Sequence, residues 1–567
     1  MHDLVIRNGT VVDGTGGAPF EGDVAIDGGR IAAVGSVSEP GHREIDAKGD
    51  IVAPGWVDIH THYDGQATWD PILAPSSWNG VTTLVMGNCG VGFAPVRPGT
   101  EGFLIELMEG VEDIPGTALH EGIDFTWESF GEYLDALEGM ERVLDIAAQV
   151  PHCAVRAYVL GERAHDLEVS DEEIEEMAQL TRDGLAAGAV GFSTSRTILH
   201  RSVHGLVPGT ASHPREILAL GKALGEAGHG VFEMVSDGAI GQTTEELEWM
   251  RKFCQETGRP LTFALAQVPF APTAFRETLA RAQEWEREGA HIVPQIPCRP
   301  TGMLFGLQST IHPFIAHPTY VKLAALPLGE RAAKLRDPAI REQLLSEKSG
   351  IESPMAQMML ANWAGMFWLG DPPDYEPEAE RSVQAAAKRE GRRPAEVALD
   401  WMLEDDGRSF MFAPLANYVD GNFEAIREMM MHPSTVLGLS DGGAHCGLIC
   451  DASMPTYLLT HWVRDRKRGE RIPIEQVVRM QTQNTARVYG FTDRGTLEPG
   501  KKADVNVIDL AGLVLHAPEM IHDLPAGGRR LTQRVDGYRY TVCSGEITWE
   551  NGEPTGAMPG KLVRGGA

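Results

Sequence analysis

The sequence predicts an α/β chain in two parts, a (β/α)8 TIM-like barrel and a small β-sandwich domain built from both chain termini. Short runs rich in Val and Ile, broken by glycine turns, fill both ends of the chain, and apolar runs alternate with helical patterns between them. The length of 567 residues also suffices for a barrel, which takes about 250 residues, and a second domain.

The β-sandwich domain is expected from residues 1–52 and 495–567. Residues 3–35 contain strand-like runs separated by Asn-Gly, Gly-Gly and Asp-Gly, and residues 495–552 have the same character. Chain ends commonly lie close together in a fold, so these two stretches are expected to form one domain. The barrel, residues 53–494, would then be an insertion within it.

Barrel strands are expected at the apolar runs of the middle region. There are nine candidates, one more than an eight-stranded barrel needs. One of them is therefore misassigned, since a short apolar run does not distinguish a strand from a helix reliably. The candidates are 51–62, 82–86, 155–160, 191–194, 231–234, 261–266, 291–296, 410–413 and 435–439.

Residues 308–374 interrupt this alternation and predict an inserted region of helices and loops within the barrel. Residues 324–343 alternate apolar and charged side chains at helical spacing. Residues 355–368 are rich in Met and Trp, which predicts either core or a cover for the active site.

The clearest chemical signal is the run VAPGWVDIHTHYD, in which His60 and His62 close an apolar stretch. Residues two apart in an extended strand point to the same side, so both imidazoles can reach one metal ion. An isolated His-x-His also occurs in proteins that bind no metal there, so whether this motif indicates a metal site depends on the sequence around it.

A second signal lies in TVLGLSDGG, where an apolar strand ends in Ser-Asp followed by two glycines. A carboxylate at a barrel strand end is placed to contact both a metal and a substrate, which makes Asp441 a candidate. The other interpretation of Asp441 is a helix N-cap after the strand.

The composition excludes some classes of partner. A formal charge of −31 argues against nucleic acid and against an anionic membrane, since both require basic patches. No apolar run reaches membrane-spanning length, and MHDLVIRNGT lacks the features of a signal peptide. Seven scattered cysteines without CxxC spacing indicate a reducing compartment, so a cytoplasmic protein is expected.

Together, these motifs resemble the amidohydrolase superfamily, and within it the D-aminoacylase (N-acyl-D-amino-acid deacylase) branch. The resemblance covers nearly the whole chain and is specific for the superfamily, less so for the substrate. It is carried by LVIRNGTVVDGTG, APGWVDIHTHYDGQATWDP, GVTTLVMGNCGVGFAPV, GAVGFSTS with VPGT downstream, GLSDGGAH, and NTARVYGFTDRGTLEPGKKADVNVID.

The resemblance implies a metal site with one or two ions, Zn²⁺ or another divalent cation. His60 and His62 would bind one ion, and Asp441 would both ligate it and act as general base toward water and the leaving amine. Cys89, in MGNCGVG, aligns with a cysteine ligand of the branch, although a lone cysteine in an apolar stretch is often an inert buried residue.

The chain departs from the branch on two strands, where the relatives carry histidine ligands. The corresponding segments read VFEMVSDG and LTFALAQVP, so Glu233 falls where the first histidine would be. A carboxylate inside an apolar strand is costly unless it is paired or binds a metal, so Glu233 is expected to be a ligand or to pair with Arg196 or Arg299. A lysine that could be carboxylated is also missing at the fourth strand, where Ser195 and Arg196 stand instead.

Recognition of a substrate carboxylate would need a cation, and a planar guanidinium suits it. The candidates follow predicted strands, where barrel loops form the site: Arg163, Arg196, Arg201 and Arg299, together with His204 and His445. Each arginine has the alternative of a structural ion pair.

The predicted function is hydrolysis of a linear amide, most plausibly an N-acyl-D-amino acid, by a homo-oligomer. Two alternatives remain open at the level of sequence. A cyclic-amide hydrolase of the hydantoinase or dihydroorotase kind shares the barrel, but the missing lysine argues against it. A non-catalytic scaffold relative would have lost the metal, and His60, His62 and Asp441 argue against that.

Overall fold

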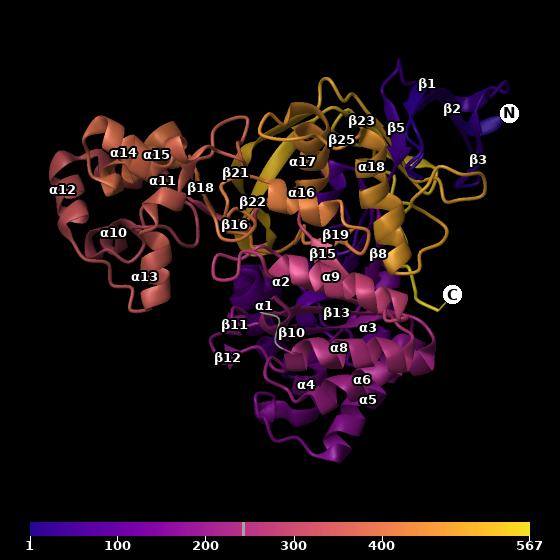
Figure 1. Ribbon diagram of the computed structural model, residues 1–567, viewed down its shortest axis with the longest axis horizontal. Coiled ribbons are helices and arrows are strands. Elements are labelled where there is room, and N and C mark those ends of the chain that lie inside the picture. The colour runs from indigo at the N-terminus through magenta and orange to yellow at the C-terminus, as the bar shows by residue number, and fades with distance from the viewer. Residues whose placement is uncertain (241–243, 567) are drawn as a thin grey trace.

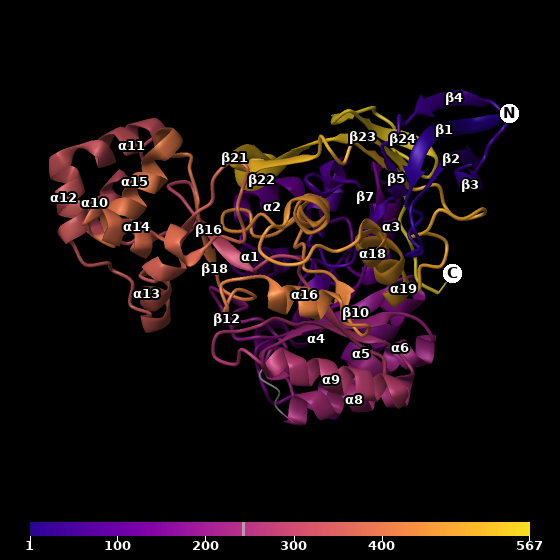
Figure 2. The same cartoon turned by 45° about the horizontal axis from the view of Figure 1, so that its top comes forward.

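The two ends of the chain share one mixed β-sheet. The computed structural model describes residues 1–240 and 244–566. The sheet has the order β25-β24-β23-β20-β5-β1-β2-β3, with β4 also on β1. Figures 1 and 2 show the N-terminal and C-terminal strands side by side. The strands are β1 (His2–Val11), β2 (Phe20–Asp27), β3 (Arg30–Gly35), β4 (Gly41–Asp46), β5 (Ile51–Pro54), β20 (Val505–Ile508), β23 (Tyr538–Cys543), β24 (Glu546–Glu550) and β25 (Glu553–Pro554).

Alternating apolar residues explain why this sheet forms. Leu4 and Ile6 of β1, Val24 of β2, and Val505 of β20 are buried in one apolar cluster. Strand β20 pairs antiparallel with β5, which joins the C-terminal part of the chain to the N-terminal part. A separate hairpin, β21 (Val514–Leu524) and β22 (Gly528–Asp536), extends from this region.

The middle of the chain contains two parallel sheets. One has three strands in the order β6-β7-β8, and the other has six in the order β19-β15-β14-β13-β10-β9. The strands are β6 (Trp56–Asp58), β7 (Val81–Met86), β8 (Asp145–Ala148), β9 (Val150–Pro151), β10 (Gly191–Arg196), β13 (Val231–Ser236), β14 (Leu261–Ala264), β15 (Ile292–Ile296) and β19 (Val436–Leu437).

The two parallel sheets meet at both edges. Thr61, after β6, forms a parallel bridge with Gly442, after β19. At the other edge Gln149, between β8 and β9, donates to Met86 O at 3.1 Å, and Val190 N donates to Ala148 O at 2.9 Å. One apolar cluster joins residues of both sheets: Val57, Ile59, Val85, Ala147, Val190, Val231 and Val436.

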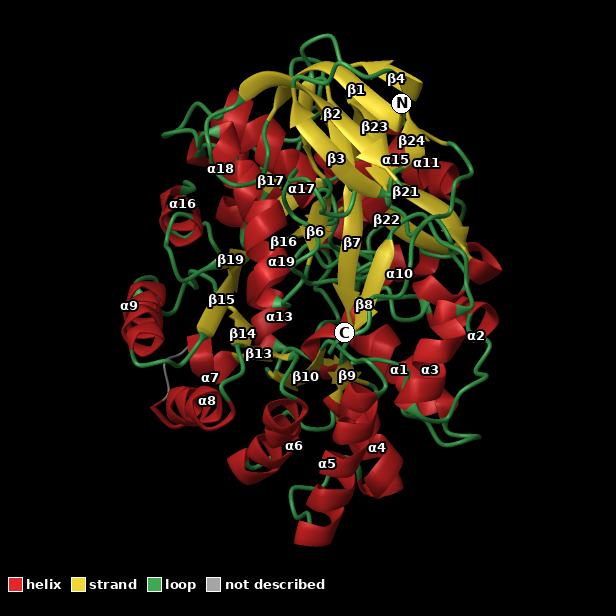
Figure 3. Cartoon of the chain, turned by 90° about the vertical axis from the view of Figure 1, so that its right-hand side faces the viewer, coloured by secondary structure: helices red, strands yellow, loops and turns green. Residues whose placement is uncertain are grey.

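Helices and short turns connect the parallel strands, as expected for βα units. Figures 1 and 3 show α5, α6, α8 and α9 on the outside of the strands. The helices are α1 (Glu101–Glu112), α2 (Gly116–Gly122), α3 (Phe130–Glu138), α4 (His152–Leu160), α5 (Asp171–Ala186), α6 (Pro214–Ala227), α7 (Asp237–Ile240), α8 (Thr244–Thr257), α9 (Ala274–Arg287), α16 (Glu424–Met430), α17 (Met454–Tyr457), α18 (Ile474–Arg479) and α19 (Thr485–Val488).

A helical lobe, defined here as residues 302–414, stands away from the parallel strands (Figures 1 and 2). Three short antiparallel strands form its base, and its helices enclose an apolar cluster of their own. The elements are β16 (Gly302–Phe305), β17 (Phe367–Trp368), β18 (Met411–Pro414), α10 (Pro318–Leu323), α11 (Leu328–Arg336), α12 (Pro338–Ser346), α13 (Pro354–Leu360), α14 (Val383–Glu390) and α15 (Pro394–Gly407).

Local sequence explains the ends of the lobe helices. Asp337 caps α12, and Ser382 caps α14, by accepting from backbone N–H groups of the first turn. Proline occupies the first turn of α10, α12, α13 and α15, where its missing N–H costs no hydrogen bond. Met355 and Met358 of α13 are 61% and 72% exposed, so these two methionines do not belong to the core.

Two of the nine strand candidates were wrong as barrel strands. Residues 155–160 lie in helix α4, and the strand is instead β8, at 145–148. A short apolar run satisfies either periodicity, and here Pro151 ends the strand just before the helix begins. Residues 410–413 overlap β18, which pairs antiparallel with β16 in the lobe.

The candidate strand 51–62 is divided in two. Strand β5 belongs to the terminal sheet, and β6 belongs to the parallel strands. Gly55 separates them, and a Cβ atom there would lie 2.2 Å from Thr82 Oγ1, so only glycine permits this close approach. His60 and His62 therefore follow the end of β6 and are not within it.

No helix among the described residues is long and apolar enough to cross a bilayer. All seven cysteines are free and buried.

Candidate metal centre and active site

The ends of β6 and β19 bring the predicted site residues together. Asp441 N donates to His60 O at 3.1 Å, and His62 N donates to Gly442 O at 2.7 Å. These backbone bonds continue the pairing of adjacent parallel strands. They align the His60–His62 segment with Asp441 although the two are far apart in sequence.

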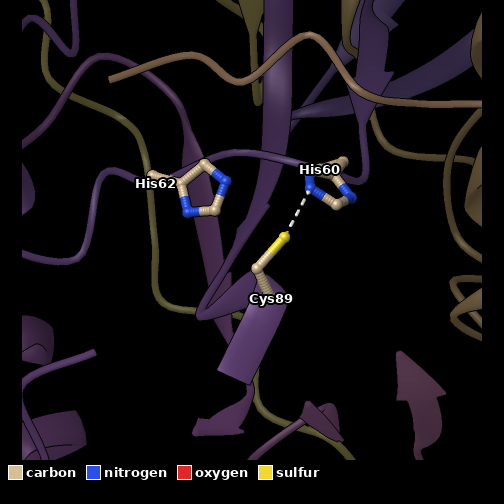
Figure 4. Close-up of side chains that lie close together, drawn as sticks. All are labelled: His60, His62 and Cys89. Atoms are coloured by element: carbon tan, nitrogen blue, oxygen red, sulfur yellow. Dashed lines mark hydrogen bonds between the residues drawn. The ribbon is translucent and has the colours of Figure 1, made fainter. Parts of the chain in front are cut away.

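Four side chains direct donor atoms toward one point. His60 Nε2 lies 3.4 Å from Cys89 Sγ, and this pair is joined by the dashed line in Figure 4. Asp441 Oδ1 lies 3.4 Å from His60 Nε2 and 3.7 Å from His62 Nε2. His60, His62 and Cys89 each offer one ligand atom, and these three atoms lie within 4.8 Å of one another. Imidazole, thiolate and carboxylate are the ligands that Zn²⁺ takes in proteins.

Cys89 is held in place by an unusual backbone. It lies in the short turn after β7 with a φ of 56°, in the left-handed region. Its N–H donates to Glu233 Oε2 at 2.7 Å. The next residue, Gly90, packs against β10 so closely that a Cβ atom would lie 2.7 Å from Thr194 Cα.

His60 has a partner for its second nitrogen. Gln295 Oε1, from β15, lies 3.0 Å from His60 Nδ1 and can only accept there, so the proton belongs on Nδ1. This leaves the Nε2 lone pair facing Cys89 and Asp441, as a metal ligand requires. Burial lowers the pKa of His60 to about 4, so the neutral imidazole is the stable form.

His62 lies between carboxylates. Its Nδ1 is 3.4 Å from Glu112 Oε1, and its Nε2 faces Asp441. Burial works to lower the pKa of His62, but the negative charges of Glu112 and Asp441 raise it to about 9. A protonated His62 cannot bind a metal through Nε2, so metal binding here releases a proton.

Glu233 is fully buried in β13 and pairs with neither of the arginines that the sequence offered. Arg196 pairs with Glu246, and Arg299 with Asp451. Glu233 Oε1 lies 3.7 Å from His60 Nδ1, on the side of the ring opposite Nε2, and has no hydrogen-bond partner. Burial raises the pKa of Glu233 to about 8, so its carboxyl group is mostly protonated at neutral pH.

Asp441 is the most accessible of the four donors. Its side chain is 17% exposed, against 1% for each histidine. Burial opposes ionisation, but the neighbouring imidazoles of His62, His60 and His445 hold the pKa of Asp441 below its usual range. Asp441 and His445 both have left-handed backbone, with φ values of 49° and 53°, a strained conformation that concentrates at functional sites.

Buried polar atoms without partners mark this region. Three such atoms lie around the donors: His62 Nδ1, Glu112 Oε1 and Glu233 Oε1. Burial, together with the charges of Glu233, Glu112 and Asp441, raises the pKa of the Cys89 thiol. A cluster of carboxylates around a buried thiol is costly by itself, and a bound cation would compensate it.

Most of the predicted recognition residues are paired outside the site, and Arg201 is exposed on a short strand after β10. Each of three arginines contacts an acidic side chain: Arg163 contacts Asp166 and Glu173, Arg196 contacts Glu246, and Arg299 contacts Asp451. Exposed His204 pairs with Glu106. Among the predicted recognition residues that the structure describes, His445 is the one that contacts a proposed ligand: its Nε2 lies 4.0 Å from Asp441 Oδ2, and its side chain is 22% exposed.

Three residues near the donors were missed from the sequence. Gln295 stands in an apolar stretch of β15, the same signal that singled out Glu233, whereas Glu112 ends α1 among other glutamates and has no such signal. His200, after β10, forms a hydrogen bond with Ser195 Oγ at 3.0 Å. Burial and the charges of His445 and His62 lower the pKa of His200 to about 3.

With the geometry described, a family assignment follows from comparison. The model of the amidohydrolase family matches residues 43–549, most of the chain. The chain belongs to the amidohydrolase family. As a member, it is a hydrolase of carbon–nitrogen bonds other than peptide bonds.

Relatives within the family include deacylases. A D-aminoacylase of Alcaligenes xylosoxydans xylosoxydans is 24% identical over 565 residues, which are 99% of this chain and 97% of that protein. A solved D-aminoacylase structure, from a study of its binuclear metal centre, superposes with a TM-score of 0.67 at 22% identity over the full length of both chains. The structure of the N-acyl-D-glutamate deacylase of Bordetella bronchiseptica, in complex with zinc and a phosphonate inhibitor, superposes with a TM-score of 0.65 at 22% identity over 99% of both chains.

Proposed function

We propose that this chain is a zinc-dependent deacylase that hydrolyses the linear amide of N-acyl-D-amino acids to a carboxylate and a D-amino acid. The observation that carries the proposal is the convergence of His60, His62, Cys89 and Asp441 on one point at the ends of two strands. The deacylase relatives, which span nearly the whole chain, support the substrate class.

The donor set fits Zn²⁺. Bonds of about 2.0 to 2.3 Å give tetrahedral donor separations of roughly 3.3 to 3.8 Å. Three donor pairs have separations of 3.4, 3.4 and 3.7 Å. We therefore assign one ion to His60, His62, Cys89 and Asp441. Glu233, which bonds the Cys89 backbone and faces the far side of His60, would support these ligands, unless a second ion binds between Cys89 and Glu233.

We further infer that the two parallel sheets form one closed barrel of eight strand positions, with β8 and β9 sharing one position. The Thr61–Gly442 bridge at one edge and the Val190–Ala148 hydrogen bond at the other support closure. The site then lies at the carboxyl ends of the strands, where barrel enzymes carry their chemistry. The terminal sheet and the β21–β22 hairpin would make up the β-sandwich domain of residues 1–52 and 495–567.

Bound Zn²⁺ would supply Lewis acidity toward water and the amide carbonyl, which requires that it accept a further ligand beside these four donors. The residues move the protons. Asp441 accepts a proton from the attacking water as the carbon–oxygen bond forms, and then donates that proton to the amide nitrogen as the carbon–nitrogen bond breaks. Its low pKa keeps it ionised before the reaction, and its exposure makes it reachable by the substrate.

His445 is the residue we assign to substrate contact. It lies beside Asp441 at the accessible side of the site and has no hydrogen-bonded acidic partner among those described. Three of the arginines that the sequence suggested, Arg163, Arg196 and Arg299, are already engaged in ion pairs, which limits them as carboxylate clamps. The homo-oligomer and the cytoplasmic location stay predictions from the sequence.

The test is hydrolysis by chelator-treated protein to which zinc has been restored. N-acetyl-D-amino acids with acidic, polar and apolar side chains are compared with their L-enantiomers and with a hydantoin, and amine release is measured. Zinc-dependent release from D-substrates alone is expected. Cleavage of the hydantoin in preference to every N-acetyl-D-amino acid, or no cleavage by zinc-loaded protein, would contradict the proposal.

A further inference from the structure

Glu112, which the mechanism above does not use, links two parts of the site. It is the last residue of α1 and is only 1% exposed. Its Oε1 lies 3.4 Å from His62 Nδ1, and its Oε2 lies 3.6 Å from His445 Nε2. One buried carboxylate thus contacts a proposed zinc ligand and a residue of the loop that carries Asp441.

The backbone of the same helix end fixes this loop. His445 N donates to Glu112 O, and Gly447 N donates to Asp113 Oδ2 at 3.0 Å. Thr310, near the base of the helical lobe, donates to the same Asp113 carboxylate at 3.0 Å. The main chain of Glu112 is therefore held against this loop by contacts that do not involve a metal.

The two histidines of the motif differ in the partner of their second nitrogen. His60 Nδ1 lies 3.0 Å from the neutral amide oxygen of Gln295, within hydrogen-bond distance. His62 Nδ1 and Glu112 Oε1 are both buried and have no hydrogen-bond partner, yet they face each other at 3.4 Å. A metal-binding imidazole ordinarily donates its second N–H to a carboxylate or carbonyl oxygen, which fixes the tautomer and raises the basicity of the ligand.

We propose that Glu112 is a positioning residue that accepts the Nδ1–H of His62, directs the His62 Nε2 lone pair at the metal, and holds His445 beside Asp441. This inference rests on the proposed zinc site. Glu112 does not touch the metal or the substrate in this account. It acts by setting the tautomer and the orientation of a ligand.

The experiment measures zinc affinity of the full-length apoprotein by competition with a chromophoric chelator. Glu112→Gln removes the charge, and Glu112→Met removes the acceptor while filling the buried space. Asp113→Asn is the matched control, because it neutralises the adjacent carboxylate but keeps an oxygen acceptor for Gly447 and Thr310, and Asp113 is not paired with His62. Unfolding midpoints of the apoproteins and visible spectra of the Co²⁺ forms are recorded for each variant.

Zinc affinity is expected to fall by about 10- to 100-fold in the Glu112 variants, more in Glu112→Met, as for the loss of other partners of ligating histidines. The visible spectra of the Co²⁺ forms of the Glu112 variants should differ from wild type, while the unfolding midpoints of their apoproteins should not change. The zinc affinity of Asp113→Asn should stay within about twofold of wild type. If neither Glu112 variant folds, Glu112→Asp, which has a shorter carboxylate side chain, replaces them in the same measurement. Its zinc affinity is also expected to be lower than that of wild type.

Zinc affinity unchanged in the folded Glu112 variants, or reduced equally in Asp113→Asn, would overturn the inference. Wild-type protein that binds zinc but cleaves no N-acyl-D-amino acid would overturn the proposed function alone. Wild-type protein that takes up no zinc would overturn both.

Discussion

The proposed metal site and the helical lobe both bury polar atoms without partners, but the atoms differ in kind. At the site, each unpartnered atom faces a group of opposite type: His62 Nδ1 lies 3.4 Å from Glu112 Oε1, and Glu233 Oε1 lies 3.7 Å from His60 Nδ1. In the lobe, the unpartnered His312 Nε2 and Arg331 Nε lie near the ring of Tyr320. An unpartnered buried atom is therefore weak evidence for a ligand, and convergence of opposite chemical types is stronger evidence.

The largest effect is expected from Asp441→Asn, because the amide cannot accept the proton of the attacking water. The value of kcat/KM should fall by about 10²- to 10⁴-fold. Steady-state kinetics with an N-acetyl-D-amino acid, on protein of measured zinc content, give the result. Activity within tenfold of wild type at equal zinc content would show that another group is the general base.

Next in size is a change in the lobe, which tests whether the two regions are independent. Leu344 is fully buried in the apolar cluster of the lobe. Leu344→Ala should cost about 2 to 5 kcal/mol of local stability through lost burial and a cavity. Hydrogen exchange should accelerate within residues 302–414, whereas zinc affinity should stay within about twofold. Equal loss of zinc binding would show that the lobe supports the metal site.

The lobe also gives a prediction for acid. Burial, with the charge of Arg331, lowers the pKa of His312 to about 3 from an ordinary value of 6.5, and its Nδ1 accepts from Phe314 N at 3.2 Å. The fold favours the neutral form. The contribution of neutral His312 to the free energy of unfolding is complete above about pH 6.5 and is lost as the pH falls toward 3. At pH 5 the loss is about 2 kcal/mol.

His312→Asn keeps an acceptor for the Phe314 N–H but does not titrate. The free energy of unfolding of the lobe, measured with denaturant at pH 7 and pH 5, should therefore fall less on acidification in the variant than in wild type. An equal loss in both proteins would assign the acid sensitivity to other groups.

The smallest effect is expected from Arg163→Ala. Arg163 is half exposed and pairs with Asp166 and Glu173, and such surface pairs contribute about 0 to 1 kcal/mol. Its loss should leave KM within about twofold. A large increase in KM with kcat unchanged would instead identify Arg163 as the carboxylate clamp.

Local sequence was sufficient for the elements whose signal is local. The strands at 81–86, 191–196 and 231–236 lie where apolar runs predicted them, and helices α11 and α12 cover the stretch with helical spacing. Residues 155–160 could not be resolved in this way, because their apolar run fits strand and helix equally. The candidate at 410–413 is a strand, but its partner, β16, lies far away in sequence.

The site shows the same limit. His60, His62, Cys89 and Asp441 stand in recognisable motifs, and their donor atoms do come together. Glu112 and Gln295 have no motif, since their importance lies in contacts with His62 and His60 that only the folded chain creates. Arg299 followed a strand, as a clamp should, but it is buried against Asp451 and stacked on Tyr375 at 4.1 Å.

The most direct test of the account is the metal content per chain of protein purified without chelator, for wild type, Cys89→Ala and Glu233→Ala. One zinc per chain in wild type and in Glu233→Ala, with zinc lost or strongly reduced in Cys89→Ala, is the predicted result. Two ions in wild type that fall to one in Glu233→Ala would contradict the single site and make Glu233 a ligand of a second ion. No metal in any of the three proteins would contradict the metal centre itself.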